Sequence, residues 1–176
     1  MKRIFGIAIL TTLLACNQAD KKSPETKDTA HTNTVSAKNE ISIKDERKLA
    51  IFTNYVDLKN ALVKSDAANA QKTAAVLKSS LAAYEGCEPT AEIAQKIASS
   101  NNLVVQRKDF TALSADIIAL LKSTEIEKGT IYVQHCPMAN KGDGGDWLSI
   151  EKEIKNPYYG NEMLECGRVT EEIKAK

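Results

Sequence analysis

The sequence has few of the residues on which catalytic sites usually depend. It contains only two histidines, and His31 stands alone in a polar stretch. No glycine-rich phosphate loop, serine nucleophile elbow or metalloprotease helix motif is present. The other histidine, His135, directly precedes Cys136, and in the strand expected there their side chains point to opposite faces, which disfavours a Cys-His dyad. We therefore expect that the protein is not an enzyme.

An excess of positive charge is also missing. The chain has 24 Lys and Arg residues against 23 Asp and Glu residues, and it has no basic block. Proteins that bind nucleic acid present a basic patch, and electrostatic membrane contacts need clustered Lys and Arg. We therefore expect no nucleic-acid partner.

The chain begins with an apolar run that is too short to span a membrane. The run from Ile4 to Leu14 follows Lys2 and Arg3 and has about 11 residues, whereas a transmembrane helix needs about 20. This pattern is typical of a secretory signal peptide, which we assign to residues 1–15. The protein is therefore expected outside the cytoplasm.

Cys16 follows this run directly. The residues Leu13-Leu14-Ala15-Cys16 resemble the lipobox of bacterial lipoproteins. The resemblance implies cleavage before Cys16 and its acylation, and two or more acyl chains anchor a protein stably to the lipid bilayer. We expect a lipid-anchored protein of the cell envelope, on the periplasmic face or in the outer membrane. The alternative is an ordinary signal peptide followed by an incidental cysteine.

Residues 16–40 are too polar to form a packed structure. From Asn17 to Glu40, Val35 is the only branched apolar residue. Such a segment cannot bury enough apolar surface to offset its ordering entropy, so we expect a disordered tether after the lipidated cysteine. The remaining residues, 41–176, have the size of one folded domain.

The first part of this domain, about residues 45–124, shows helical periodicity in four segments. Asp45 and Asp66 are expected N-caps of the first two helices. Pro89 opens a third, and Asn101-Asn102 marks a break before the last. Helices with short joints pack antiparallel. The predicted fold is mainly α, an antiparallel four-helix bundle with a small C-terminal α+β subregion.

That subregion, about residues 129–170, has a different period. Residues 131–136 alternate in polarity, which predicts a short strand ended by Pro137. Loops and short helices should follow. Met163 and Cys166 are three positions apart, so a helical turn would place both sulfurs on one face.

Soft donor side chains are concentrated in this subregion. They are two thiols, two thioethers and one imidazole: Cys136, Cys166, Met138, Met163 and His135. This set suits Cu(I), and we expect Ag(I) to substitute, whereas zinc favours thiolates and imidazole. The sequence lacks a CxxC pair, which argues against a structural zinc site. We predict a soft-metal site here, with His135 as the weakest candidate donor.

A structural disulfide between Cys136 and Cys166 is the alternative. Exported compartments favour oxidation, and closing a loop of about 31 residues would stabilise the fold by roughly 3 to 4 kcal/mol. The methionines would then be ordinary core residues. A redox-sensitive site, metal-bound when reduced and crosslinked when oxidised, would contain both states. Cys87 is left unpaired and is expected to be a structural thiol, with intermolecular pairing or a metal role as alternatives.

Several motifs resemble one known family, catalogued as domain of unknown function 3347. They are Tyr132 to Met138, Trp147-Leu148-Ser149, Asn156 to Gly160, Met163-Leu164 and Cys166-Gly167, and upstream Arg107, Phe110, Leu113 and Ser114 look like the family's last bundle helix. The resemblance covers about residues 48–170. Family members occur as lone Bacteroidota lipoproteins and fused to periplasmic adaptors of copper and silver efflux pumps, which implies a role in metal homeostasis.

Two functional hypotheses follow. The first is a membrane-anchored extracytoplasmic lipoprotein that binds Cu(I) or Ag(I) and buffers it or transfers it to an efflux complex or its adaptor. The second is a disulfide-stapled envelope interaction module without metal, which contacts a partner through a helical face or residues 147–159.

Overall fold

Four α-helices and five strands form the part of the chain that the structure describes, residues 40–175 of a computed structural model. All of these residues belong to one compact unit. The predicted signal peptide, Cys16 and the tether up to residue 39 lie outside the described residues.

The helices begin where polar side chains can cap them. They are α1 (Glu46–Val63), α2 (Ala67–Ala82), α3 (Glu88–Ala98) and α4 (Leu103–Lys122). The side chains of Asp45, Asp66 and Asn102 accept hydrogen bonds from backbone N–H groups in the first turns of α1, α2 and α4. α3 has no such cap and carries Pro89 in its first turn, where an N–H group would have no partner. The four predicted helices are therefore confirmed.

Apolar side chains at helical spacing fill the core between the helices. In α1 and α4 the fully buried members include Ile51, Tyr55, Leu58, Leu62, Phe110, Leu113, Ile117 and Leu121. Burying a side chain of this size stabilises a fold by about 1.5 to 3 kcal/mol. The helices are thus held together mainly by apolar contacts. No helix within residues 40–175 combines the length and apolarity needed to cross a membrane.

The strands form two antiparallel sheets. They are β1 (Ser42–Ile43), β2 (Ile126–Lys128), β3 (Thr130–Cys136), β4 (Gly145–Ser149) and β5 (Arg168–Lys174). β1 pairs with β2, whereas β3 is the central strand of the larger sheet and pairs with β4 and β5. In this register Cys136 lies opposite Gly145, and His135 lies opposite Asp146.

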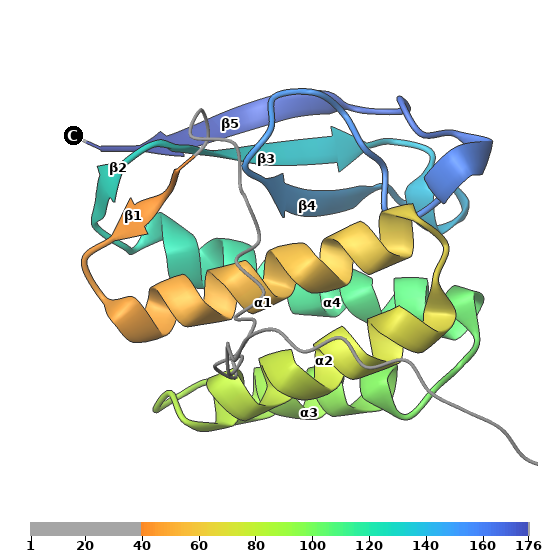
Figure 1. Cartoon of the computed structure of the whole chain (residues 1–176). Coiled ribbons are helices and arrows are strands. Elements are labelled where there is room, and N and C mark those ends of the chain that lie inside the picture. The colour runs from red at the N-terminus through yellow and green to blue at the C-terminus, as the bar shows by residue number, and fades with distance from the viewer. Residues whose placement is uncertain (1–39, 176) are drawn as a thin grey trace, which may run out of the picture. The chain divides into compact units, whose positions relative to one another are not determined.

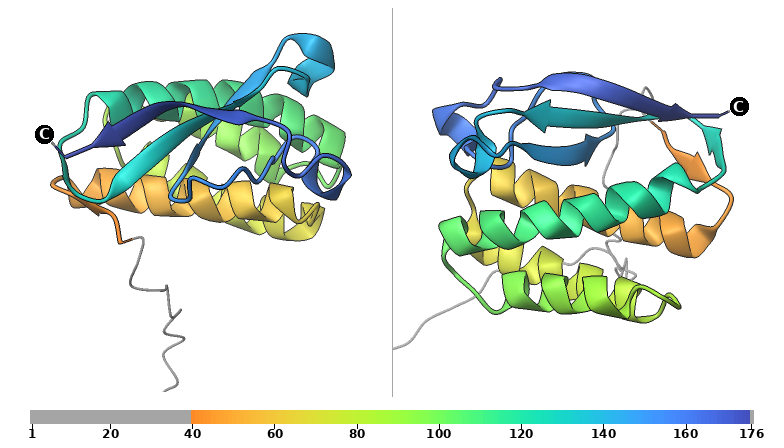
Figure 2. Two further views of the ribbon diagram at one scale, coloured as in Figure 1. Left: turned by 90° about the horizontal axis from the view of Figure 1, so that it is seen from above. Right: turned by 180° about the vertical axis from the view of Figure 1, so that it is seen from behind.

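The larger sheet covers one side of the helices. In Figure 1 this sheet lies above α1 and α4, and α2 and α3 lie below them; Figure 2 shows the same order from behind. Aromatic rings join the layers, because Phe110 stacks on Tyr55 with 5.4 Å between ring centroids and meets the edge of Tyr158 at 5.8 Å. Tyr158 in turn meets Trp147 of β4 at 6.1 Å. Helices and sheet therefore share one core.

The structure confirms an α-rich fold that ends in a strand-containing region, but it corrects two details. The C-terminal region contains more strand than predicted, since β5 exposes most of its side chains and has no apolar alternation to reveal it. The helical turn predicted over Met163 and Cys166 is wrong. Met163 has φ −147°, outside the helical range, and the pair is instead spanned by a turn that a hydrogen bond from the Cys166 N–H to the Met163 carbonyl closes at 3.1 Å.

Candidate functional site

The two cysteines of the predicted metal site lie side by side. The Sγ atoms of Cys136 and Cys166 are 2.6 Å apart, and both side chains are free thiols. Cys136 is fully buried, whereas Cys166 is partly exposed. The separation is shorter than the roughly 3.5 to 4.0 Å at which non-bonded heavy atoms attract each other best. The two sulfur atoms are therefore in direct contact.

β3 positions Cys136 and directs His135 elsewhere. Alternate side chains of a strand point to opposite faces, so the buried Cys136 shares its face with Gln134 and not with His135. The Nδ1 atom of His135 lies 2.9 Å from the Asp146 carboxylate, and the ring packs against Gly144. The structure thus brings the two cysteines together without His135.

A glycine allows Cys166 to reach its partner. Gly167 has φ +146°, which favours glycine. A Cβ atom at this position would lie 2.8 Å from the carbonyl oxygen of His135 and 2.9 Å from the Trp147 ring. The absence of a side chain therefore lets the chain pass against β3 and β4 directly after Cys166.

The two methionine residues lie beside Cys166. The backbone N–H of Met138 lies close enough to the Cys166 thiol to lower the pKa of that thiol, and the Met138 residue is 51% exposed. Met163 lines an open hollow of about 450 Å³ together with Leu164, Glu165 and Cys166. Two thioether-bearing residues thus flank the more accessible of the two thiols.

The surroundings of the Cys166 thiol favour its protonated form. Its hydrogen bond with Cys136 raises its pKa above the ordinary value of 9.0, burial adds to this effect, and the Met138 N–H opposes it. A metal must displace the thiol proton, because the thiolate is the ligand form. Metal binding at this pair would therefore release protons and weaken as the pH falls.

Histidine, cysteine and carboxylate side chains do not complete a metal site by themselves. Across residues 40–175, no group of three or more of these side chains is arranged to hold a metal ion. The cysteine pair supplies two donors, and Met138 and Met163 are the neighbouring residues that carry further soft donors. Thioethers suit Cu(I), whereas structural zinc sites use thiolate and imidazole ligands. The donor set therefore fits Cu(I) better than zinc.

Two residues that the sequence did not assign to the site support it through hydrogen bonds. The buried Asn156 donates from Nδ2 to the Cys166 carbonyl at 2.8 Å, and the Tyr159 hydroxyl donates to the Met138 carbonyl at 2.6 Å. Both belong to the segment from Asn156 to Gly160, whose asparagine, proline and glycine indicate a tight turn. That turn signal, and the family-like motif from Asn156 to Gly160, are the sequence features that could have pointed to them.

Cys87 takes no part in this site. It is nearly buried at the start of α3, in the helical layer that lies farthest from the larger sheet in Figure 1. Burial raises the pKa of its thiol and so disfavours the reactive thiolate. These observations agree with a structural role.

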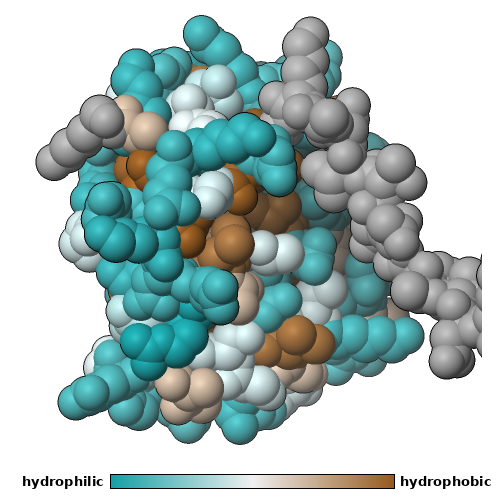
Figure 3. Space-filling model, turned by 60° about the vertical axis from the view of Figure 1, so that its left-hand side comes forward, coloured by the Kyte–Doolittle hydropathy of each residue, from teal (hydrophilic) through white to brown (hydrophobic). Residues whose placement is uncertain are grey.

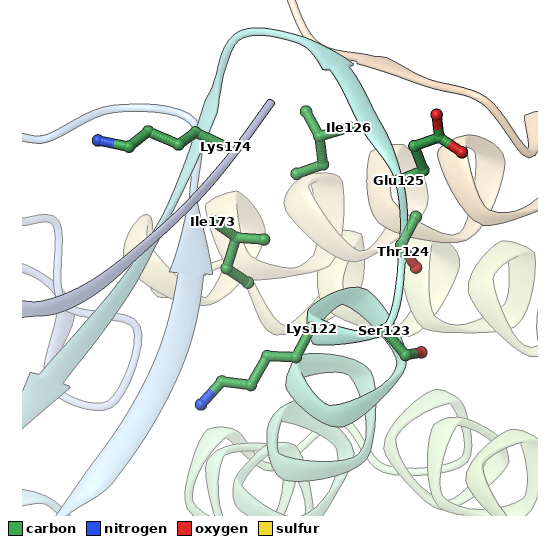
Figure 4. Close-up of a pocket in the computed structure, with 7 residues that line it drawn as sticks. All are labelled: Lys122, Ser123, Thr124, Glu125, Ile126, Ile173 and Lys174. Atoms are coloured by element: carbon green, nitrogen blue, oxygen red, sulfur yellow. The ribbon is translucent and has the colours of Figure 1, made fainter. Parts of the chain in front are cut away.

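A second hollow, of about 520 Å³, lies at the far end of β3. Its lining comes from the end of α4, from β2 and from β5, and Figure 4 shows these residues: Lys122, Ser123, Thr124, Glu125, Ile126, Ile173 and Lys174. In Figure 3 the apolar side chains of the visible face are gathered in its middle and rimmed by hydrophilic ones. Both lysines of the hollow already pair with glutamates of β5, at 2.5 and 3.5 Å. The lining contains no sulfur donor.

These features define an α-rich domain with a C-terminal antiparallel sheet that carries a pair of adjacent thiols. Residues 51–129 match the family described as "Protein of unknown function (DUF3347)". The match confirms the family resemblance over these residues, whereas the motifs from Tyr132 onward lie outside it. It runs from the second turn of α1 to Gly129 and does not include the thiol pair. No curated protein and no solved structure matches the chain.

Proposed function

We propose that this protein binds Cu(I) or Ag(I) outside the cytoplasm through Cys136, Cys166, Met163 and Met138. One observation carries the proposal: two thiols meet at 2.6 Å, and the more accessible one is flanked by two thioether-bearing residues. Thiolate and thioether donors select soft cations such as Cu(I). His135 is the weakest of the candidate donors, because Asp146 holds its ring on the other face of β3.

Metal binding requires a small movement of Cys166. Two thiolates on a tetrahedral ion with metal–sulfur bonds of about 2.3 Å lie about 3.8 Å apart. The sulfurs, now 2.6 Å apart, must therefore separate by roughly 1 Å. Cys166 lies in a partly exposed turn beside the open hollow, whereas Cys136 belongs to the central strand and is fully buried. Cys166 is the ligand that moves.

The proposed role is that of a lipid-anchored envelope protein. The signal pattern and the lipobox-like residues that end at Cys16 support a membrane anchor, and the helices serve as an antiparallel bundle that carries the metal site. Such a protein buffers soft metal ions or transfers them to an efflux complex or its adaptor. The proposal includes no catalytic step.

An anaerobic competition experiment tests this function. The reduced full chain is titrated with Cu(I) against a strong chromogenic Cu(I) chelator. We expect stoichiometric retention of one Cu(I). Cys136→Ser and Cys166→Ser should each weaken binding by more than the roughly 10- to 100-fold typical for loss of a group that only supports a ligand. Cys87→Ser is the matched control and should bind like the wild type. A reduced wild type that retains no copper contradicts the proposal.

The second candidate is a disulfide-stapled interaction module that binds no metal. The same 2.6 Å contact favours it, because the sulfurs are already close to the bonded distance of about 2.05 Å. In that case the protein isolated without reductant has a single free thiol among the three cysteines of residues 40–175, that of Cys87. Three free thiols in the untreated protein would contradict it. Copper retention after reduction would favour the first candidate.

A further inference from the structure

We infer that Asn156 and Tyr159 are positioning residues that fix two proposed soft donors, Cys166 and Met138, relative to each other. This inference rests on the proposed function. Neither side chain offers a soft donor atom, so neither is a ligand. Their role follows from the backbone groups that they hold.

Asn156 ties the Cys166 segment to a tight turn. Its side chain is fully buried, and the Oδ1 atom accepts hydrogen bonds from the N–H groups of Tyr158 and Tyr159 at 2.8 and 3.3 Å. Its Nδ2 atom donates to the Cys166 carbonyl at 2.8 Å, and its backbone N–H donates to the Leu164 carbonyl at 2.8 Å. Asn156 therefore fixes both the turn and the loop segment that carries Cys166.

Tyr159 ties the same turn to Met138. Its hydroxyl donates to the Met138 carbonyl at 2.6 Å. Hydrogen bonds thus lead from the Cys166 segment through Asn156 and Tyr159 to Met138. Both donor segments are held by the same turn.

Arg107 of α4 anchors this turn to the helices. Its Nε atom donates to the Pro157 carbonyl at 2.9 Å, and its Nη2 atom donates to the Leu62 carbonyl at 3.2 Å and to Ser65 Oγ at 2.9 Å. Gly160 lies so close that a Cβ atom there would be 2.9 Å from Nη2 of Arg107. The helical core therefore sets the position of the turn, and the turn sets the position of the donors.

This arrangement matters because Met138 and Cys166 come from separate loops. Without a link between them, metal binding would have to order both loops and would lose affinity. Hydrogen-bonding partners outside the ligand set commonly contribute 10- to 100-fold to metal affinity. We therefore expect the turn to raise affinity by pre-organising the site.

The test uses the reduced full chain labelled with ¹³C-methyl methionine and titrated with Ag(I). Ag(I) is redox-inert and reports each thioether through its methyl signal; Met138→Leu and Met163→Leu assign the two signals. In the wild type both signals should shift. Tyr159→Phe should lower Ag(I) affinity by about tenfold and reduce the Met138 shift while the Met163 shift persists, with a thermal midpoint close to that of the wild type. Tyr132→Phe, in a partly exposed tyrosine of β3, is the control and should change neither readout.

Asn156→Asp is the second variant, since it keeps an acceptor for the turn but loses the donor to the Cys166 carbonyl. It should lower Ag(I) affinity and disturb the Met163 signal, which lies in the turn before Cys166. If the wild type binds Ag(I) and both variants match it in affinity and methyl shifts, the positioning role is overturned and the proposed function stands. If the reduced wild type binds no Ag(I), the proposed function fails and this inference fails with it.

Discussion

The helical part and the C-terminal part of the chain share one apolar core but differ in how their loops are fixed. Between α1 and α4 the core is built from fully buried aliphatic and aromatic side chains at helical spacing. The C-terminal part also buries apolar side chains, such as Trp147 and Leu148, but there single side chains bond in addition to backbone groups of the loops. Gln134 donates to the carbonyls of residues 151, 152 and 153, and Asn156 and Tyr159 hold the segments of Cys166 and Met138.

Apolar packing thus accounts mainly for the stability of the fold, and the hydrogen bonds account for the exact position of the loops. Apolar contacts are non-directional and tolerate small shifts, whereas hydrogen bonds fix atoms to within a few tenths of an ångström. A metal site needs the precise positioning that hydrogen bonds provide. The helical part, which makes up most of the family match, is therefore the support, and the C-terminal part is the region whose geometry carries the proposed chemistry.

The largest expected effect comes from the residue that joins the two parts. Phe110→Ala removes a fully buried ring that contacts Tyr55 of α1 and Tyr158 of the C-terminal part. We expect a loss of about 3 to 5 kcal/mol in the free energy of unfolding, measured by urea denaturation. Val104→Ala, at a 75% exposed position of the same helix, is the control and should change it by less than about 0.5 kcal/mol. If Phe110→Ala and Val104→Ala change the free energy of unfolding by similar amounts, Phe110 does not join the two parts.

The next effect depends on the oxidation state of the thiol pair. In protein treated with a thiol oxidant, we expect the wild type to be about 3 to 4 kcal/mol more stable than Cys166→Ser, because the bond closes a long loop. With reductant, the difference in free energy of unfolding between wild type and Cys166→Ser should fall below about 1 kcal/mol. Denaturation curves with and without reductant provide the measurement. A gap that does not respond to reductant would show that Cys166 contributes by packing alone.

Lys59 is a buried lysine near the C-terminal part, and its replacement should stabilise the protein rather than destabilise it. Burial lowers the pKa of Lys59 in α1 from 10.5 to about 8, with Glu151 opposing this and Lys155 adding to it. Between about pH 8 and 10.5 the unfolded lysine holds a proton that the folded one has lost, so its destabilising effect is full below pH 8 and fades as the pH rises. Lys59→Met should stabilise the protein by roughly 1 to 3 kcal/mol at pH 7.

The difference between wild type and Lys59→Met should narrow as the pH is raised toward 10.5. Urea denaturation at several pH values checks this, and subtraction of the two curves removes the contribution of other titrating groups. A difference that is constant with pH would mean that Lys59 is charged in the folded state throughout.

A smaller effect is expected where a helix bonds to the sheet. The Tyr55 hydroxyl bonds to Ser114 Oγ at 2.8 Å and accepts from the Leu148 N–H of β4 at 3.1 Å. Tyr55→Phe keeps the ring but leaves the Leu148 N–H without its partner, so we expect a loss of about 1 to 2 kcal/mol. Amide hydrogen exchange should show faster exchange at Leu148 with little change inside α2. Unchanged exchange at Leu148 would rule out this link.

The sequence predicts the helical part well because its signals are local. The caps at Asp45 and Asp66 and the apolar spacing in each helix lie within a few residues of the elements that they define. The strand predicted over residues 131–136 is found as β3, and with it the opposite directions of His135 and Cys136. These features need no knowledge of distant parts of the chain.

The rest of the C-terminal part depends on contacts that are remote in sequence. β5 has no apolar period and forms because β3 offers it an edge, with residues such as Thr130 and Lys174 paired. The convergence of Cys136 and Cys166 follows from that pairing and from the close passage at Gly167. Asn156 reads as an ordinary turn residue until the structure shows what its amide holds.

The single tryptophan of the chain gives the molecule a built-in optical reporter. Trp147 is fully buried, and its ring lies against Gly167, the residue that follows Cys166. Any movement of Cys166 must therefore pass next to the only indole in the protein. Intrinsic fluorescence should follow ion loading or thiol oxidation in real time, without a label and without a change to the sequence.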